Sequence, residues 1–326
     1  MKIVMIQRPS GSGFSLEAVY GAIHKELSQE IDISVFKLNK NNFFKDLLEL
    51  RKMKADLYHI TGDVHYLTLF LPKNKSVLTI HDVGRYINDL KGLKKWIYKI
   101  VWITLPIYFS GAIFFSSEIT KNRVLEITSL DRKLSFIAKL CSNLEFKNPE
   151  TKRRGQKPCI LHVGTASHKN LHTVLKSIKE IECKLLIVGE LIESDRSYLI
   201  DKKIEFKNYI NINKKELEGL YLESDIVTFP SLHEGFGLPI IEAQASRTPV
   251  ITSNFSPMSE VAGSGAILIN PLNVDEMIES VNRVLLDSEF TRKLIDRGFD
   301  NARLYSTEVV ASEHLGYYRR IIDSRI

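Results

Sequence analysis

The chain has 326 residues, of which 44% are hydrophobic, 26% charged and 9% aromatic. These ordinary globular values exclude a disordered, collagen-like or disulfide-scaffold protein, and the length suggests two domains. The net charge of +6 is uneven, because residues 1–150 carry 22 basic and 15 acidic side chains whereas residues 151–326 carry 23 and 24. Either an anionic partner of the first half or chance solubility charge would explain this asymmetry.

Short apolar runs alternate with helical patterns in the first half. The predicted strands there cover residues 2–7, 33–38, 57–61, 77–80 and 112–116. The spacing of apolar residues over 15–28 predicts a helix between the first two strands. Strands separated by helices indicate an α/β fold with a parallel sheet and crossover helices.

A polar stretch with prolines and a glycine then interrupts the pattern, and we interpret residues 148–158 as a linker. Beyond it, strands are predicted at 159–163, 184–188, 225–230, 249–252 and 267–269, and helices at 170–181, 239–246, 274–287, 289–304 and 307–323. The sequence therefore predicts one parallel-sheet domain over 1–147, a second over 159–305, and a final helical segment, 306–326, that packs back on the first. In two such domains, ligands bind in the cleft at the carboxyl ends of the strands.

Residues 97–115 contain one charge, Lys99, and satisfy a crude length criterion for a membrane span. Pro106 and Gly111 instead favour an amphipathic helix over 92–108, followed by a strand. Lysines and tryptophans without acidic neighbours are typical of a helix on a membrane surface, and they are Lys91, Lys94, Lys95, Trp96, Lys99 and Trp102. A packed domain helix with a solvated basic face is the alternative.

Three cysteines, Cys141, Cys159 and Cys183, form no CxxC pair and are expected to be reduced thiols of a cytoplasmic protein. The apolar run at the N-terminus is shorter than a signal peptide requires, so we expect no secretion by that route.

The strongest motif is SLHEGFGLPIIE at residues 231–242. It follows a predicted strand, and Gly235 and Gly237 allow close approach of the backbone to a ligand. Pro239 opens a helix whose free N–H groups would face an anion. Glu234 and Glu242 could both accept hydrogen bonds from sugar hydroxyls in one pocket.

A second motif, VGTASHKN at residues 163–170, also connects a strand to a helix. A lysine at a helix N-terminus is unfavourable for the helix alone. Lys169 is explained if a diphosphate binds there.

The segment PSLHEGFGLPIIEA resembles the E-x7-E signature of family-4 retaining glycosyltransferases. That family has the GT-B fold, in which two Rossmann-like domains face each other across a cleft. Further segments follow the family's order over most of 159–305, including 162–171, 185–189 and 204–210. In the first half the resemblance is weaker and includes the segment TIHD at residues 79–82.

The resemblance implies roles for individual residues. Glu234 would contact the donor sugar, Glu242 the ribose, and Lys169 the diphosphate, while His81 would lie near the reacting sugar. The implied donor-binding residues are Gly164, Thr165, Lys169, Tyr209, Ile210, Ser231, Glu234, Gly235, Phe236, Gly237, Leu238 and Glu242. The implied acceptor or phosphate loop comprises Gly11, Ser12, Gly13, His81 and Asp82.

By the same resemblance, the chain would transfer a hexose-type sugar from a UDP- or GDP-linked donor to a saccharide or lipid-linked acceptor, with retention of configuration. This reaction would serve cell-surface polysaccharide synthesis, without a metal or other cofactor and without nucleic acid as a partner. The location would be cytoplasmic or peripheral on the inner face of the membrane. The alternatives are a non-catalytic GT-B binding subunit and a GT-B sugar-nucleotide epimerase. An epimerase would be expected to place more acid and base side chains in the cleft than this sequence offers.

Overall fold

The computed structural model describes residues 1–9, 15–39, 41–128, 134–146 and 157–324. The chain divides into two compact units. The first comprises Met1–Asn143 together with Ser306–Ile326, and the second comprises Leu144–Tyr305. The predicted loop Gly11–Gly13 and most of the predicted linker lie outside the described residues.

The first unit is built on a six-stranded sheet in the order β2-β1-β3-β4-β5-β6, with every pair parallel. Its strands are β1 (Lys2–Gln7), β2 (Asp32–Lys37), β3 (Leu57–Ile60), β4 (Ser76–Ile80), β5 (Ala112–Phe115) and β6 (Leu134–Ile137). Ile3 through Ile6 of β1 are completely buried. A continuous apolar run of this kind is what a central parallel strand requires, because helices cover both faces of the sheet.

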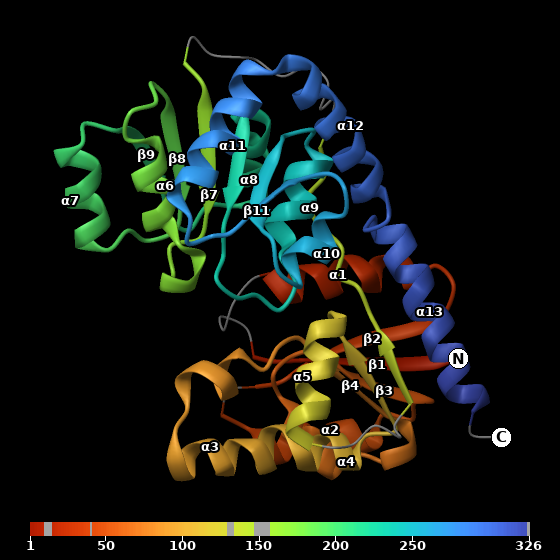
Figure 1. Ribbon diagram of the computed structural model, residues 1–326. Coiled ribbons are helices and arrows are strands. Elements are labelled where there is room, and N and C mark those ends of the chain that lie inside the picture. Colours follow the sequence, from red (N-terminus) through yellow and green to blue (C-terminus); the bar gives the residue numbers. More distant parts are fainter. Residues whose placement is uncertain (10–14, 40, 129–133, 147–156, 325–326) are drawn as a thin grey trace. The chain divides into compact units, whose positions relative to one another are not determined.

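The helices of this unit are α1 (Ser15–Leu27), α2 (Phe43–Lys52), α3 (Gly92–Tyr98), α4 (Leu105–Phe109), α5 (Glu118–Thr128) and α13 (Thr307–Asp323). Figure 1 shows α1 on one side of the sheet and α2 and α4 on the other. The helix predicted over 92–108 is divided, because a π-helical stretch, Lys99–Thr104, separates α3 from α4. The last helix, α13, belongs to this unit and packs against α1.

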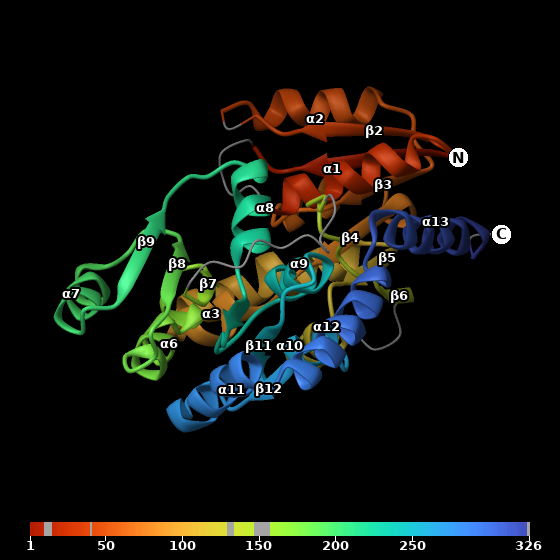
Figure 2. The same cartoon turned by 90° about the horizontal axis from the view of Figure 1, so that it is seen from above.

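The second unit is also built on a six-stranded parallel sheet, in the order β12-β11-β10-β7-β8-β9. Its strands are β7 (Cys159–Val163), β8 (Lys184–Val188), β9 (Glu205–Tyr209), β10 (Ile226–Phe229), β11 (Val250–Ser253) and β12 (Ile267–Ile269). Its helices are α6 (Leu171–Ile178), α7 (Glu193–Asp201), α8 (Lys214–Glu223), α9 (Leu238–Ala245), α10 (Met258–Ala262), α11 (Val274–Leu286) and α12 (Ser288–Arg303). Figure 2 shows α8 on one side of this sheet and α11 on the other.

In each sheet the first strand of the unit has a neighbour on both sides, and the strand order reverses beside it. Loops that leave the carboxyl ends of neighbouring strands diverge at such a point and create a place for a ligand. The two motifs of the second unit follow β7 and β10, which are neighbours in the sheet. The fold therefore brings the loops of both motifs to one edge.

Candidate functional site

The loop after β7 folds closely around a glycine. Gly164 has φ +99° and donates its N–H to Val188 O over 2.8 Å. A Cβ atom at this position would lie 2.9 Å from Cγ of Lys169. The absence of a side chain at Gly164 therefore lets the aliphatic part of Lys169 cross its backbone. A short 3₁₀ turn, Ser167–Lys169, and Asn170 with φ 60° complete the turn into α6.

Lys169 and Glu234, which the sequence predicted as separate contacts, form an ion pair. The distance from Nζ to Oε1 is 2.6 Å, and the side chains are 20% and 14% exposed. The ammonium also lies 4.7 Å from the ring centre of Phe229, the last residue of β10. Partial burial strengthens this attraction relative to a surface pair, so the two side chains hold each other at the mouth of the loops.

The glycine-rich part of the second motif positions the start of α9. Gly237 has φ +113°, and Leu238 and Pro239 are the first residues of the helix. Phe236 is 5% exposed and packs edge-on against Tyr305, so its side chain contributes to packing rather than facing a ligand. A ligand contact of Gly235, Phe236 or Gly237 would therefore use the backbone. Ser231 is buried, and its hydroxyl makes no hydrogen bond within the described residues.

Glu242 lies one turn into α9 and is 7% exposed. The hydroxyl of Tyr221 in α8 donates to its Oε2 over 2.7 Å. Burial raises the pKa of Glu242 to about 7, opposed by the hydrogen bond from Tyr221 and by the charge of Lys169. The carboxyl group is thus poised to change its charge near neutral pH.

The remaining predicted donor residues lie at the ends of β7 and β9. Thr165 contacts Gly189, where a Cβ atom would meet its hydroxyl at 2.6 Å. Tyr209 ends β9, and its carbonyl accepts the N–H of Gly189 over 2.8 Å. Ile210, the next residue, is 50% exposed and leaves an apolar surface at this edge.

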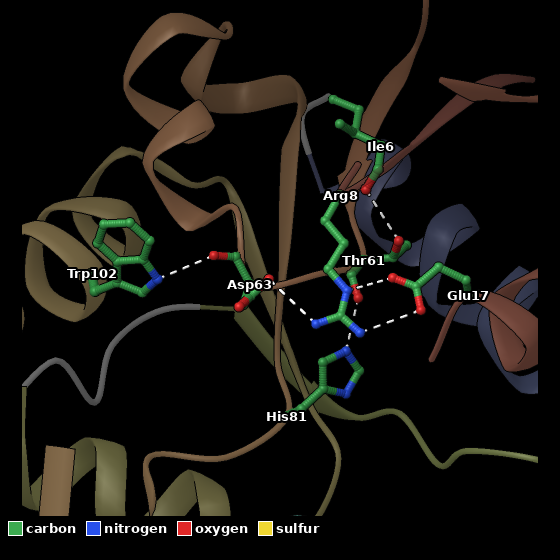
Figure 3. Close-up of polar contacts among 7 residues, drawn as sticks. All are labelled: Ile6, Arg8, Glu17, Thr61, Asp63, His81 and Trp102. Atoms are coloured by element: carbon green, nitrogen blue, oxygen red, sulfur yellow. Dashed lines mark hydrogen bonds and ion pairs between the residues drawn. The ribbon is translucent and has the colours of Figure 1, made fainter. Parts of the chain in front are cut away.

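In the first unit, an unpredicted cluster lies at the carboxyl ends of β1 and β3 (Figure 3). Arg8 makes a two-point ion pair with Glu17 of α1, and Nη1 of Arg8 lies 3.7 Å from Asp63. The hydrogen bond that Arg8 donates to Glu17 is the main reason why the pKa of Arg8 is raised. The only sign of this cluster in the sequence was an arginine directly after the first strand. Its partners, Glu17 and Asp63, are too distant along the chain to be recognised as such.

His81 is fixed at the end of β4 in the same region. Its Nε2 is 2.8 Å from Thr61 O, as Figure 3 shows. A carbonyl only accepts, so Nε2 carries the proton and Nδ1 keeps a lone pair, which has no partner within the described residues. Burial lowers the pKa of His81. Asp82 instead accepts the N–H of Gly84 over 2.8 Å, which is a local turn contact.

The predicted membrane-surface residues divide into two groups. Trp96 is 60% exposed, and Lys91 and Lys94 are also exposed. Leu93 beside them, which was not part of the prediction, is 70% exposed. Lys95 lies over the ring of Tyr86, with Nζ 4.7 Å from its centre, and Lys99 is half-buried.

Trp102 departs from the prediction that it belongs to this surface. It is half-buried, stacks on Tyr98, and donates its indole N–H to Asp63 O over 3.1 Å. The π-helical stretch changes the direction of successive side chains, which the assumed regular helix over 92–108 did not include. Among the described helices, none combines the length and apolar composition needed to cross a membrane.

Comparison with known proteins gives a family match to the second unit. The family model for glycosyl transferases group 1 matches residues 144–300. The O-antigen chain mannosyltransferase RfbU of Salmonella typhimurium is 25% identical over 257 residues, which are 72% of this chain and 69% of RfbU. The MMP alpha-(1->4)-mannosyltransferase of Mycolicibacterium hassiacum is 29% identical over 160 residues, 47% of this chain and 39% of that protein.

The fold of the whole chain is similar to that of HepE from Anabaena, whose structure was solved with UDP and glucose. The TM-score is 0.75 at 14% identity, covering 98% of this chain and 100% of HepE. At this identity the similarity concerns the fold alone. The chain therefore has the α/β GT-B fold with two Rossmann-like domains, and most of its second unit matches the family model for glycosyl transferases group 1.

Proposed function

We propose that the chain is a retaining glycosyltransferase of family 4 that moves a hexose-type sugar from a UDP- or GDP-linked donor to a saccharide or lipid-linked acceptor. The observation that carries the proposal is the Lys169–Glu234 pair, 2.6 Å apart in the loops after β7 and β10 of the group 1 domain. Such a pair offers a cation to a diphosphate and a carboxylate to sugar hydroxyls. The name of RfbU supports a place in cell-surface polysaccharide synthesis.

The proposed reaction breaks the bond between the anomeric carbon and the diphosphate oxygen. That carbon forms a new bond to the acceptor oxygen, and the acceptor proton passes to the leaving diphosphate. Negative charge grows on the diphosphate as the bond breaks, so a fixed cation lowers the barrier. Lys169 supplies this cation, and the first N–H groups of α9 add to it, so that no metal ion is required. Attack on the face from which the diphosphate departs retains the configuration.

Separate roles follow for the two carboxylates of the E-x7-E motif. Glu234 is exposed enough to receive donor-sugar hydroxyls once the diphosphate draws Lys169 away. Glu242 is more deeply buried and receives the ribose hydroxyls. Exposed Ile210 and the adjacent strand end at Tyr209 lie against the base. The first unit receives the acceptor, with His81 and Asp82 as its predicted contacts.

A panel of nucleotide sugars tests this proposal, with release of free nucleotide measured with and without saccharide acceptors. We expect acceptor-dependent release with at least one UDP- or GDP-linked hexose, unchanged by EDTA, and an NMR spectrum that shows a product with the anomeric configuration of the donor. Nucleotide binding without turnover of any pair would instead indicate a binding subunit. Isomerised sugar without nucleotide release would indicate an epimerase.

We also propose that the exposed basic and aromatic side chains of α3 rest on an anionic membrane surface. Leu93, Trp96 and Lys94 present both apolar area and positive charge, which together favour interfacial binding. Co-sedimentation with vesicles containing anionic lipid should therefore fall at high salt. The variant Lys94→Glu/Trp96→Ala should lose this binding, and Lys176→Glu in α6 should keep it. Equal binding of both variants would exclude this surface.

A further inference from the structure

Tyr221 in α8 is a completely buried tyrosine whose hydroxyl is directed at the candidate nucleotide site. Its ring lies edge-on to Phe146, with ring centres 5.9 Å apart. Its carbonyl accepts the hydroxyl of Thr248 over 3.0 Å. These contacts fix both the backbone and the ring, so the hydroxyl has little freedom to turn away from Glu242.

The two carboxyl oxygens of Glu242 have different surroundings. Oε2 accepts the Tyr221 hydroxyl over 2.7 Å. Within the described residues no side-chain or backbone donor reaches Oε1, and this oxygen is not fully enclosed by protein. One oxygen is therefore held by the protein, and the other is left to accept a hydrogen bond from a ligand.

Two groups control the charge of this carboxyl. Tyr221 acts on it from α8, and Lys169 acts on it from the turn before α6, where the ammonium is already paired with Glu234. Burial opposes ionisation, and both of these neighbours favour it. A hydrogen bond to the ionised form is stronger than one to a neutral carboxyl, so the tyrosine contact matters most when Glu242 is charged.

We infer that Tyr221 is a positioning residue of the nucleotide site, whose hydroxyl holds Oε2 of Glu242 so that the ionised carboxylate presents Oε1 to a ribose hydroxyl. The inference rests on the proposed function, because it assumes that a nucleotide binds in the second unit. It adds a residue outside the motif to the binding site. It also makes nucleotide affinity depend on the ionisation of one carboxyl group.

Calorimetric titration with UDP and GDP from pH 5.5 to 9 tests the inference. For the nucleotide that binds, the measured quantity is the ratio of the wild-type affinity to the affinity of Glu242→Gln. We expect this ratio to rise with pH, with a midpoint near neutral pH, and to reach about tenfold or more at high pH. The ratio removes the titration of the nucleotide's own terminal phosphate, which is common to both proteins. Tyr221→Phe should move this midpoint to higher pH by about one unit, because the carboxylate loses a donor that favours its charged form.

The control is Tyr198→Phe in α7 of the same unit, which should leave the midpoint unchanged. A merely structural role of Tyr221 would lower affinity equally at every pH, and an unmoved midpoint in Tyr221→Phe would overturn the inference. If Tyr221→Phe folds poorly, Tyr221→Phe/Glu242→Gln decides the question. Added to Glu242→Gln, the tyrosine change should weaken nucleotide binding by less than about twofold. A larger independent loss would also overturn the inference, whereas no nucleotide binding by wild type would count against the proposed function instead.

Discussion

Each unit places a cation at the carboxyl end of its first strand, but the two cations are held differently. Lys169 pairs with one carboxylate, Glu234, whereas Arg8 lies between Glu17 and Asp63. An ammonium with one partner can turn to an incoming diphosphate. A guanidinium bound at two points by a carboxylate is fixed, because its planar fork matches that partner. The cation of the second unit can therefore exchange partners, whereas that of the first belongs to a fixed polar framework.

The largest expected effect is that of removing the Lys169 ammonium on the rate of sugar transfer. If Lys169 stabilises the leaving diphosphate, Lys169→Ala should lower kcat of sugar transfer about 10²- to 10³-fold, the range seen when one group that stabilises developing charge is removed. The measurement is acceptor-dependent nucleotide release with the donor identified by the panel. Lys176→Ala, an exposed lysine of α6, is the control. A Lys169→Ala rate within about threefold of wild type would contradict this role.

Acid should destabilise the first unit more than the second. Burial lowers the pKa of four histidines in the first unit, His59, His65, His81 and His314, the last to about 4. Unfolding lets each take up a proton below about pH 6.5, so each costs roughly 1.4 kcal/mol of stability per pH unit from there down to its folded pKa. In the second unit His162 behaves in the same way, with its pKa lowered to about 4. Glu242 opposes it, because a pKa raised to about 7 means that acidification from pH 7 toward 4.5 stabilises the fold.

Hydrogen exchange of peptides from both units, at pH 7.5 and 5.5 and corrected for intrinsic rates, measures this difference. We expect the first unit to lose more protection. His314→Phe should reduce that loss, because the histidine is buried with Nε2 unpaired within the described residues. An equal loss in both units would show that these histidines do not set the acid sensitivity.

The smallest effect concerns two glycines that follow sheet strands. Gly164→Ala should destabilise the second unit by about 1–3 kcal/mol, since φ is +99° and the new Cβ would lie 2.9 Å from Lys169. Gly62→Ala in the first unit should stay within about 0.5 kcal/mol, because the nearest atoms lie 3.6 Å away and φ is not positive. Denaturant unfolding checks both values. A similar loss of unfolding free energy in both variants would contradict the expectation that only the loop at Gly164 requires a glycine.

The sequence predicted the central strands and the second-unit motifs because their signals are local. The buried apolar run of β1 and the segment from Ser231 to Glu242 each indicate their structure within a dozen residues. Contacts that join distant positions could not be read in the same way. Arg8 meets Asp63 because β1 and β3 are neighbours in the sheet, and Tyr221 of α8 meets Glu242 of α9 through a hydrogen bond.

The prediction of one regular helix over residues 92–108 failed for a different reason. Its composition predicted a helix, but the π-helical stretch from Lys99 to Thr104 depends on local packing that periodicity does not encode. Trp96 is exposed, as a surface residue must be, whereas Trp102 is half-buried and bonded to Asp63 O. Contact with a membrane stays a prediction.

The placement of α13 affects how the protein is made. Because the second unit is inserted between two segments of the first, it is synthesised before α13. The first-formed sheet therefore folds to completion last, and until then α1 exposes the apolar face that α13 will cover. The N-terminal half of a newly made chain should thus be the part most dependent on chaperones.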